Sequence, residues 1–323
     1  MRVDVQRPDV RVHGAQWPNA RPQDPPPEPQ ERAIVFGPDR GLVGVVTHPT
    51  AGATDAAGRA PRRAVVMANI GVMHHVGPFR LYVELARGAA ALGWHALRFD
   101  LSGLGDSAPR SGARTSAAQA QADVLAALDW LEQTLGVREV VLVGLCSGVD
   151  STHPVAVADP RVVGAVFVDG YTYPTWGYHL RRHTLRYLQL ERWRRAVRRR
   201  MRRLRAGAPN GSAPRAPEDA APQGAFQREY PTRARFRDDV AHVAARGARL
   251  LFVFTGTFDG HFNAERQMHE ILGRRYPRAA VDVALFRGAD HLFTGARQRA
   301  RFFERVQRWL AEFPASARQT DAL

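Results

Sequence analysis

A short apolar strand that runs directly into a glycine-flanked cysteine is the most constraining feature of this chain. Residues 140–143 (VVLV) lead into residues 144–148 (GLCSG), with Cys146 at the centre. Glycines on both sides of the cysteine leave room for a side chain raised on a strained turn between a strand and a helix. Such an elbow places the sulfur at a helix N-terminus, where the helix dipole favours the thiolate. The pattern predicts a strand–elbow–helix unit with Cys146 as a nucleophile.

Two later loops supply partners for this nucleophile. The apolar run 249–254 ends in a loop that carries Asp259, and the run 281–286 ends in a loop that carries His291. The chain order nucleophile, acid, histidine is the order that this architecture requires. We expect His291 to act as general base toward the thiol and general acid toward the leaving group, and Asp259 to orient the imidazole. Asp169, at the end of the strand after the elbow helix, is the alternative acid.

Two further segments give the chain a resemblance to the α/β-hydrolase superfamily. Residues 99–107 (FDLSGLGDS) look like the D-x-x-G-x-G-x-S signature that ends the fourth strand of that fold. Residues 69–71 (NIG), after the apolar run 64–68, stand where the superfamily carries the HG motif of its oxyanion loop. The resemblance covers almost everything between residues 34 and 310. It implies an α/β-hydrolase fold, with a mostly parallel central sheet, helices on both faces and an inserted helical cap.

A narrower resemblance links the chain to the serine-aminopeptidase-like hydrolases associated with bacterial exosortase gene clusters. It rests on residues 69–71, on residues 74–80 (HHVGPFR) and on residues 288–294 (GADHLFT). Two departures from the superfamily pattern stand out: Cys146 replaces the usual serine, and Asn69 replaces the usual histidine.

The resemblance also implies an oxyanion hole, which needs two backbone N–H groups aimed at one point. Ser147, the residue after the nucleophile, provides the first N–H group. The loop after Asn69 provides the second, and we prefer Gly71 over Ile70 for it. Neither role depends on a side chain.

The spacing of the apolar runs divides the chain into a core, an insertion and two tails. Strands alternate with helices up to Asp169, which predicts a parallel sheet, and the alternation resumes only near residue 249. A long excursion inside a compact domain is usually a lid over a site. We expect a disordered Pro-rich tail (1–32), a core (33–169 and 231–315), an arginine-rich helical cap with a flexible loop (170–230) and a C-terminal tail (316–323).

The chain has a net charge of +15, and all of its Lys and Arg positions are arginine. Twelve arginines lie between Arg181 and Arg205 against the single acid Glu191, on a segment whose apolar residues recur at helical spacing. This helix fits a solvated face in an arginine-biased composition, a docking face for an acyl carrier protein or the phosphates of coenzyme A, or a surface for nucleic acid or an anionic membrane. The sequence contains no nucleic-acid-binding motif, so we expect no specific nucleic-acid partner.

Several kinds of site and location are not expected. No run of about twenty apolar residues could span a membrane, residues 1–32 lack the apolar region of a signal peptide, and a single cysteine cannot form an intrachain disulfide. We therefore expect a cytoplasmic protein, whose oligomeric state the sequence leaves open. His74 and His75 have no further ligands at metal-binding spacing, and no Gly-rich phosphate loop follows a strand, so we expect neither a metal nor a cofactor.

A cysteine nucleophile forms a thioester, which exchanges readily with thiols, amines, alcohols or water. Cysteine also stands in the elbow of α/β-hydrolase-fold relatives such as polyester synthases, dienelactone hydrolases and some natural-product thioesterases. We therefore expect an acyl-transfer enzyme, a thioesterase-like hydrolase or acyltransferase that acts on an activated acyl group. The alternatives are a small-ester or lactone hydrolase, and a non-catalytic hydrolase-like binding protein in which Cys146 is inert.

Overall fold

A central sheet of eight strands organises this computed structural model, which describes residues 29–50, 61–110, 115–188, 230–257, 261–274 and 276–314. The order of the strands in space is β1-β2-β4-β3-β5-β6-β7-β8. Their bounds are β1 (Glu31–Phe36), β2 (Leu42–Thr47), β3 (Arg63–Met67), β4 (His95–Phe99), β5 (Glu139–Leu145), β6 (Val162–Val168), β7 (Arg249–Thr255) and β8 (Val281–Phe286).

The direction of the strands decides where their loops meet. β1 and β2 are antiparallel to each other, β2 is antiparallel to β4, and every other pair, from β4 through β3 to β8, is parallel. Strands β5, β6 and β7 are buried along almost their whole length, which explains their continuous apolar sequences. Because parallel strands end at the same edge of a sheet, the loops after β5, β6, β7 and β8 lie together at one edge.

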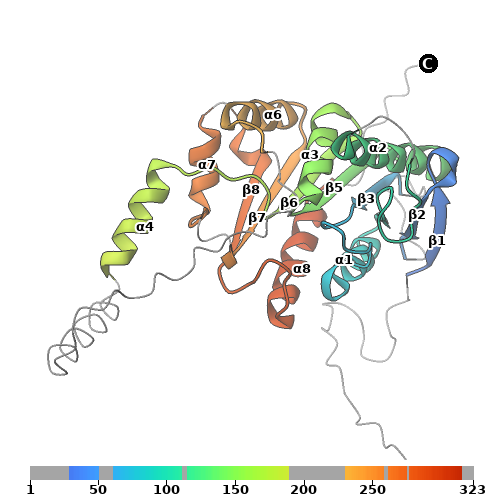
Figure 1. Ribbon diagram of the computed structural model, residues 1–323, viewed down its shortest axis with the longest axis horizontal. Coiled ribbons are helices and arrows are strands. Elements are labelled where there is room, and N and C mark those ends of the chain that lie inside the picture. Colours follow the sequence, from blue (N-terminus) through green and yellow to red (C-terminus); the bar gives the residue numbers. More distant parts are fainter. Residues whose placement is uncertain are drawn as a thin grey trace, which may run out of the picture.

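Helices cover both faces of the sheet (Figure 1). Alternate residues of β5 face the two layers: Val140 and Leu142 belong to one apolar cluster, whereas Val141 and Val143 belong to the other. The first cluster is completed by α2 (Ser116–Leu135), α3 (Gly148–Ala158), α6 (Arg233–Ala245) and α7 (Arg266–Leu272), and the second by α1 (Leu81–Ala91) and α8 (Ala296–Ala311).

Local sequence sets the limits of the longest helix, α2. At its start the Thr115 hydroxyl accepts a hydrogen bond from the N–H of Ala118 at 3.3 Å. At its end Gly136 adopts a left-handed conformation (φ 66°), which stops the helix. Both ends of the helix are therefore set by residues visible in the sequence.

The connection from β6 to β7 begins with α4 (Trp176–Leu188), which lies beyond α7 at the end of the sheet (Figure 1). Residues 189–229, which include most of the arginine-rich segment, are outside the described residues. Arg181 at the start of this segment already has partners, because its guanidinium contacts Glu270 Oε1 at 2.7 Å and Asn263 Oδ1 at 2.8 Å. This ion pair fixes α4 to α7 and removes one arginine from any docking face.

The predicted architecture, a mostly parallel sheet with helices on both faces, is confirmed. The first strand begins two residues earlier than expected, at Glu31. The division into tails, core and cap stays a prediction, since residues 1–28, 189–229 and 315–323 are not described. In the described ranges no helix combines the length and the apolar character needed to cross a membrane.

Candidate active site

Cys146 stands on a sharp turn between β5 and α3, as the glycine pattern predicts. Its backbone is left-handed (φ 55°), and its N–H donates to the carbonyl of Val168 in β6 at 2.9 Å. A Cβ at Gly148 would lie 2.9 Å from the carbonyl oxygen of Asn69, and a Cβ at Gly144 would lie 2.8 Å from that of Gly148. Neither position accepts a side chain, so both glycines are a steric requirement of the elbow.

His291 joins the cysteine to a carboxylate. Its Nδ1 lies 2.7 Å from Asp169 Oδ2, and its imidazole also forms a hydrogen bond with the Cys146 side chain. The backbone N–H of His291 donates to Thr257 Oγ1 at 3.0 Å, which ties the histidine loop to the end of β7. Thiol, imidazole and carboxylate therefore form one chain of hydrogen bonds across the loops after β5, β8 and β6.

Asp169 is held firmly at the end of β6. Its side chain is fully buried, and Thr255 of β7 donates to it twice: the N–H to Oδ1 at 2.8 Å and the hydroxyl to Oδ2 at 2.7 Å. The N–H of Asp169 donates to the carbonyl of Val253 at 2.9 Å. Its backbone is left-handed (φ 47°), a conformation that aspartate tolerates better than most residues. These contacts fix the orientation of the carboxylate toward His291.

For the acid, the structure describes only one of the two candidates. Superfamily position favoured Asp259, which belongs to residues 258–260 and is outside the described residues, so this choice stays a prediction. The carboxylate that the structure places at hydrogen-bond distance from His291 is that of Asp169, the alternative acid. β6 lies directly beside β5, so the end of β6, with Asp169, is next to the elbow. A signal for this was present, because Asp169 immediately follows the apolar run 162–168.

The electrostatics of the site favour a protonated imidazole. The pKa of His291 is raised from 6.5 to about 9, first by the hydrogen bond to Asp169 and next by the hydrogen bond to Cys146. Burial acts in the opposite direction but is the weaker effect. An imidazolium beside the sulfur stabilises a thiolate, the nucleophilic form of cysteine.

This raised pKa predicts a pH-dependent stability. The folded protein holds the His291 proton more tightly than the unfolded chain, so the stabilisation is complete below pH 6.5 and is lost as the pH rises through about 9. In denaturant titrations we expect the free energy of unfolding to fall across this window, and His291→Gln to lose a pH-dependent part on the order of 2 kcal/mol. The exposed His242 of α6 provides the matched control, His242→Gln. A wild-type curve parallel to that of His291→Gln would contradict the ion pair.

The two residues expected to form the oxyanion hole lie next to each other. Gly71 follows β3 in a left-handed conformation (φ 56°), and Ser147 precedes α3. The N–H of Gly71 donates to Ser147 Oγ at 2.8 Å. The structure thus brings the predicted pair together through the side chain of Ser147, which sequence reasoning left out of the site.

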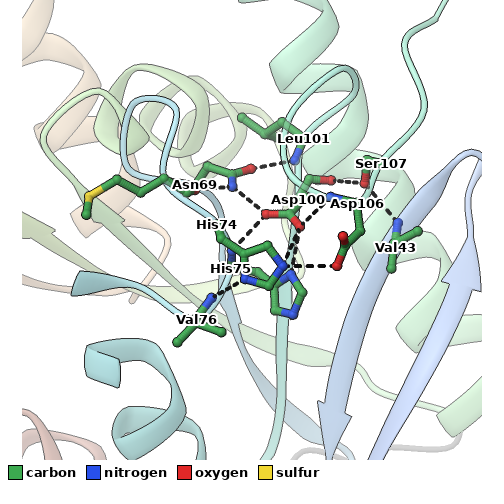
Figure 2. Close-up of polar contacts among 10 residues, drawn as sticks. Val43, Asn69, His74, His75, Val76, Asp100, Leu101, Asp106 and Ser107 are labelled. Carbon is green, nitrogen blue, oxygen red and sulfur yellow. Dashed lines mark hydrogen bonds and ion pairs between the residues drawn. The ribbon is translucent and has the colours of Figure 1, made fainter. Parts of the chain in front are cut away.

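Asn69 holds the loop after β3, the loop expected to form part of the oxyanion hole, by side-chain hydrogen bonds (Figure 2). Its Nδ2 donates to the carbonyl of Met73 at 2.5 Å and to Asp100 Oδ1 at 2.6 Å. Its Oδ1 accepts the N–H of Leu101 at 2.5 Å. A carboxamide offers both a donor and an acceptor, so one side chain joins the oxyanion loop to the end of β4.

Asp100 is the centre of a network of hydrogen bonds that includes Asn69, His75 and Asp106, and we call this network the brace (Figure 2). It is fully buried and accepts the N–H and the Nδ1–H of His75, both at 2.7 Å, and the N–H of Asp106 at 3.1 Å. Burial raises the pKa of Asp100, but the hydrogen bonds from His75, Asp106 and Asn69 outweigh it and hold the pKa below its usual value. A Cβ at Gly105 would collide with this carboxylate. The D-x-x-G-x-G-x-S motif therefore provides a buried carboxylate, and hydrogen bonds to this carboxylate hold the loop after β3 in place.

The brace also gathers possible metal ligands that sequence spacing did not reveal. Within the described ranges, ligand atoms of His74, His75, Asp100 and Asp106 lie within 4.8 Å of one another, because two loops meet here. His74 Nδ1 accepts the N–H of Val76 at 3.4 Å, which leaves Nε2 as the donor toward Asp106 Oδ2 at 3.0 Å. Both imidazoles face the carboxylates, so an ion bound here would replace the hydrogen bonds between them.

Comparisons with known proteins place the architecture. No family model matches the chain, and no curated protein matches it. One similar solved structure is an alpha-beta serine hydrolase homologue from Coxiella burnetii, with 15% identity and a TM-score of 0.50; the match covers 87% of this chain and 97% of the other. The esterase domain of a Rhodothermus marinus protein has 16% identity and a TM-score of 0.50, with 87% of this chain and 98% of the other covered. A Pyrococcus furiosus esterase has 13% identity and a TM-score of 0.51, with 92% of this chain and 95% of the other covered.

The chain has the α/β-hydrolase fold, as the sequence resemblance predicted. At identities this low the likeness concerns the fold alone, and one fold supports many activities. What the site does must therefore be argued from its own residues.

Proposed function

We propose that the protein is an acyl-transfer enzyme that forms an acyl-Cys146 thioester and passes the acyl group to water or to another acceptor. The observation that carries the proposal is the hydrogen-bonded chain from the elbow sulfur through His291 to the buried Asp169, with its 2.7 Å Nδ1–Oδ2 contact. A buried cysteine of purely structural importance needs neither the strained backbone (φ 55°) nor an imidazole partner.

The chemistry follows from which group holds the proton. His291 holds the thiol proton, and the Cys146 thiolate attacks the carbonyl carbon, so that the C=O electron pair moves onto oxygen. When this pair returns, the bond to the leaving group breaks and His291 gives the leaving group its proton. The acceptor then loses a proton to His291 and attacks the thioester, and Cys146 leaves as the thiolate.

Asp169 serves this cycle by orientation. Its carboxylate accepts from His291 Nδ1, which turns Nε2 toward the sulfur and stabilises the imidazolium. The oxyanion would lie between the N–H groups of Ser147 and Gly71. The brace around Asp100 keeps the Gly71 loop in place while charge develops, so no reorganisation is required during the reaction.

A cysteine nucleophile suits thioester donors, since the reaction exchanges one thioester for another and one thiolate for another. We therefore propose acyl thioesters, carried on an acyl carrier protein or on coenzyme A, as the first substrate class. Both carriers present phosphates, which arginine binds well. The arginines beyond residue 188 are the candidate contact for such a carrier.

Intact-protein mass spectrometry tests the proposal. The protein is incubated with short- and long-chain acyl-coenzyme A, acyl N-acetylcysteamine thioesters and para-nitrophenyl esters, with Cys146→Ala in parallel. We expect the wild type to gain the mass of the acyl group and Cys146→Ala to gain none. Labelling by thioesters before esters would support the thioester class, and labelling by esters alone would favour a small-ester hydrolase. A wild type without adduct or turnover on any donor would make the protein a binding module instead.

A further inference from the structure

The side chain of Ser147 occupies the predicted oxyanion hole. Ser147 was expected to contribute only its backbone N–H, yet its Oγ accepts the N–H of Gly71 at 2.8 Å. A backbone N–H points in one direction, so the atom that accepts from it stands close to where a substrate oxygen would accept. A substrate oxygen that accepted directly from the Gly71 N–H would have to replace Oγ, whereas a substrate oxygen beside Oγ could accept from the hydroxyl.

The hydroxyl has an unused hydrogen. A serine Oγ has two lone pairs and one hydrogen, and the contact with Gly71 uses a lone pair. In the part of the chain that the structure describes, no contact gives this hydrogen an acceptor. Ser147 is half-buried, as is Cys146 beside it, so the hydrogen can be directed at a substrate bound over the sulfur.

We propose that the Ser147 hydroxyl is a side-chain donor of the oxyanion hole, an assignment that rests on the proposed acyl transfer. The N–H of Gly71 holds and polarises Oγ, and Oγ–H donates to the carbonyl oxygen as negative charge develops on it. The hole then has two direct donors, the N–H and the hydroxyl of Ser147. In this assignment the Gly71 N–H, given above as a direct donor, acts on the oxyanion through Oγ instead.

Physical chemistry favours this order of bonds. A hydroxyl that accepts one hydrogen bond becomes a better donor in the next, because the two bonds polarise each other. A hydrogen bond to an oxyanion is stronger than one to a neutral carbonyl, so the contact stabilises the transition state more than the bound substrate. Ser147 makes no bond to the acyl group and neither gains nor loses its proton during the cycle.

The alternative role for the Ser147 hydroxyl is to block the oxyanion hole in the free enzyme. If the hydroxyl only fills the hole until substrate arrives, the substrate must displace it before Gly71 can donate. Removal of the hydroxyl would then speed acylation. Removal of the Ser147 hydroxyl thus slows acylation if the hydroxyl is a donor, and it speeds acylation if the hydroxyl only blocks the hole.

The experiment compares Ser147→Ala with Ser147→Thr, which keeps the hydroxyl. Single-turnover acylation of Cys146 by the best donor is followed by rapid quench and mass spectrometry. Alkylation of Cys146 by iodoacetamide, which passes through no oxyanion, reports on the nucleophile alone. For Ser147→Ala we expect acylation to slow by about 100-fold, in the range for loss of one oxyanion donor, with the alkylation rate unchanged. Ser147→Thr should retain most of the acylation rate.

Affinity for a trifluoromethyl ketone, which forms a tetrahedral adduct with the cysteine, should weaken in Ser147→Ala in parallel with acylation. An alanine variant that acylates as fast as the wild type, or faster, would overturn the role of Ser147 and leave the proposed acyl transfer intact. Parallel losses of acylation and alkylation would overturn it too, since they would mean a damaged elbow. A wild type that takes no acyl group from any donor would remove the proposed function and this role together.

Discussion

We expect Cys146→Ala to lower kcat/KM toward acyl thioesters by at least about 10⁴-fold, because in the proposed reaction the sulfur itself forms the bond to the acyl carbon. His291→Ala is expected to cost a similar factor, since the same imidazole accepts the thiol proton and returns it to the leaving group. The measurements are steady-state turnover and adduct formation, with thermal unfolding to confirm that each variant folds. Turnover that survives in Cys146→Ala would place the reaction at another nucleophile.

Cys146→Ser is the finer variant of this experiment. A serine hydroxyl fits the elbow, but it does not ionise beside an imidazolium as a thiol does. We expect activity toward thioesters to fall by about 100-fold or more, while the fold is kept. Full thioester activity in Cys146→Ser would contradict the argument that cysteine stands here for its thiolate chemistry.

Asp169→Asn has the second largest expected effect, a fall in kcat/KM of about 10³–10⁴-fold. The carboxylate accepts from Thr255 and from His291, and an asparagine would turn an N–H toward one of these donors. The imidazole would then adopt the wrong tautomer, and its Nε2 would no longer be oriented to accept the proton of the Cys146 thiol. Thr255→Val removes one of these hydrogen bonds and should cost about 5- to 10-fold, as expected for a single hydrogen bond.

Asp259→Asn is the matched comparison, since both aspartates follow neighbouring strands and both were candidates for the acid. We expect Asp259→Asn to reduce kcat/KM by far less than Asp169→Asn does. The pH profile separates the two cases further, because loss of the acid lowers the pKa of His291 from about 9 and so shifts the range in which the imidazolium survives. The reverse ranking of the two variants would restore Asp259 as the acid.

The parts of the fold that depend on local pattern could be predicted from the sequence. Continuous apolar runs mark β5, β6 and β7 because these strands are buried on both faces. The elbow could be predicted because steric exclusion at Gly144 and Gly148 leaves a visible trace in the sequence. The pairing of Cys146 with His291 could be predicted because each residue follows an apolar run and because their order matches that of the α/β-hydrolase architecture.

The parts that depend on which loops meet in space could not be predicted. Asp169 and Asp259 both follow buried strands, so the apolar pattern does not rank them, and the contact of Asp169 with His291 depends on how two distant loops meet. The contact of Gly71 with Ser147 depends on a side-chain direction, which spacing does not encode. The brace of Asn69 and Asp100 joins two loops about thirty residues apart in the sequence, so no local pattern announces it.

Asp169 is the last residue before the chain leaves the sheet for the insertion, yet the donors to its carboxylate, Thr255 and His291, come from beyond the insertion. The returning half of the fold, and not the segment that follows the acid in sequence, therefore holds it. We therefore expect substitutions of the arginines beyond residue 188 to leave the hydrogen bonds of Asp169 with Thr255 and His291 intact.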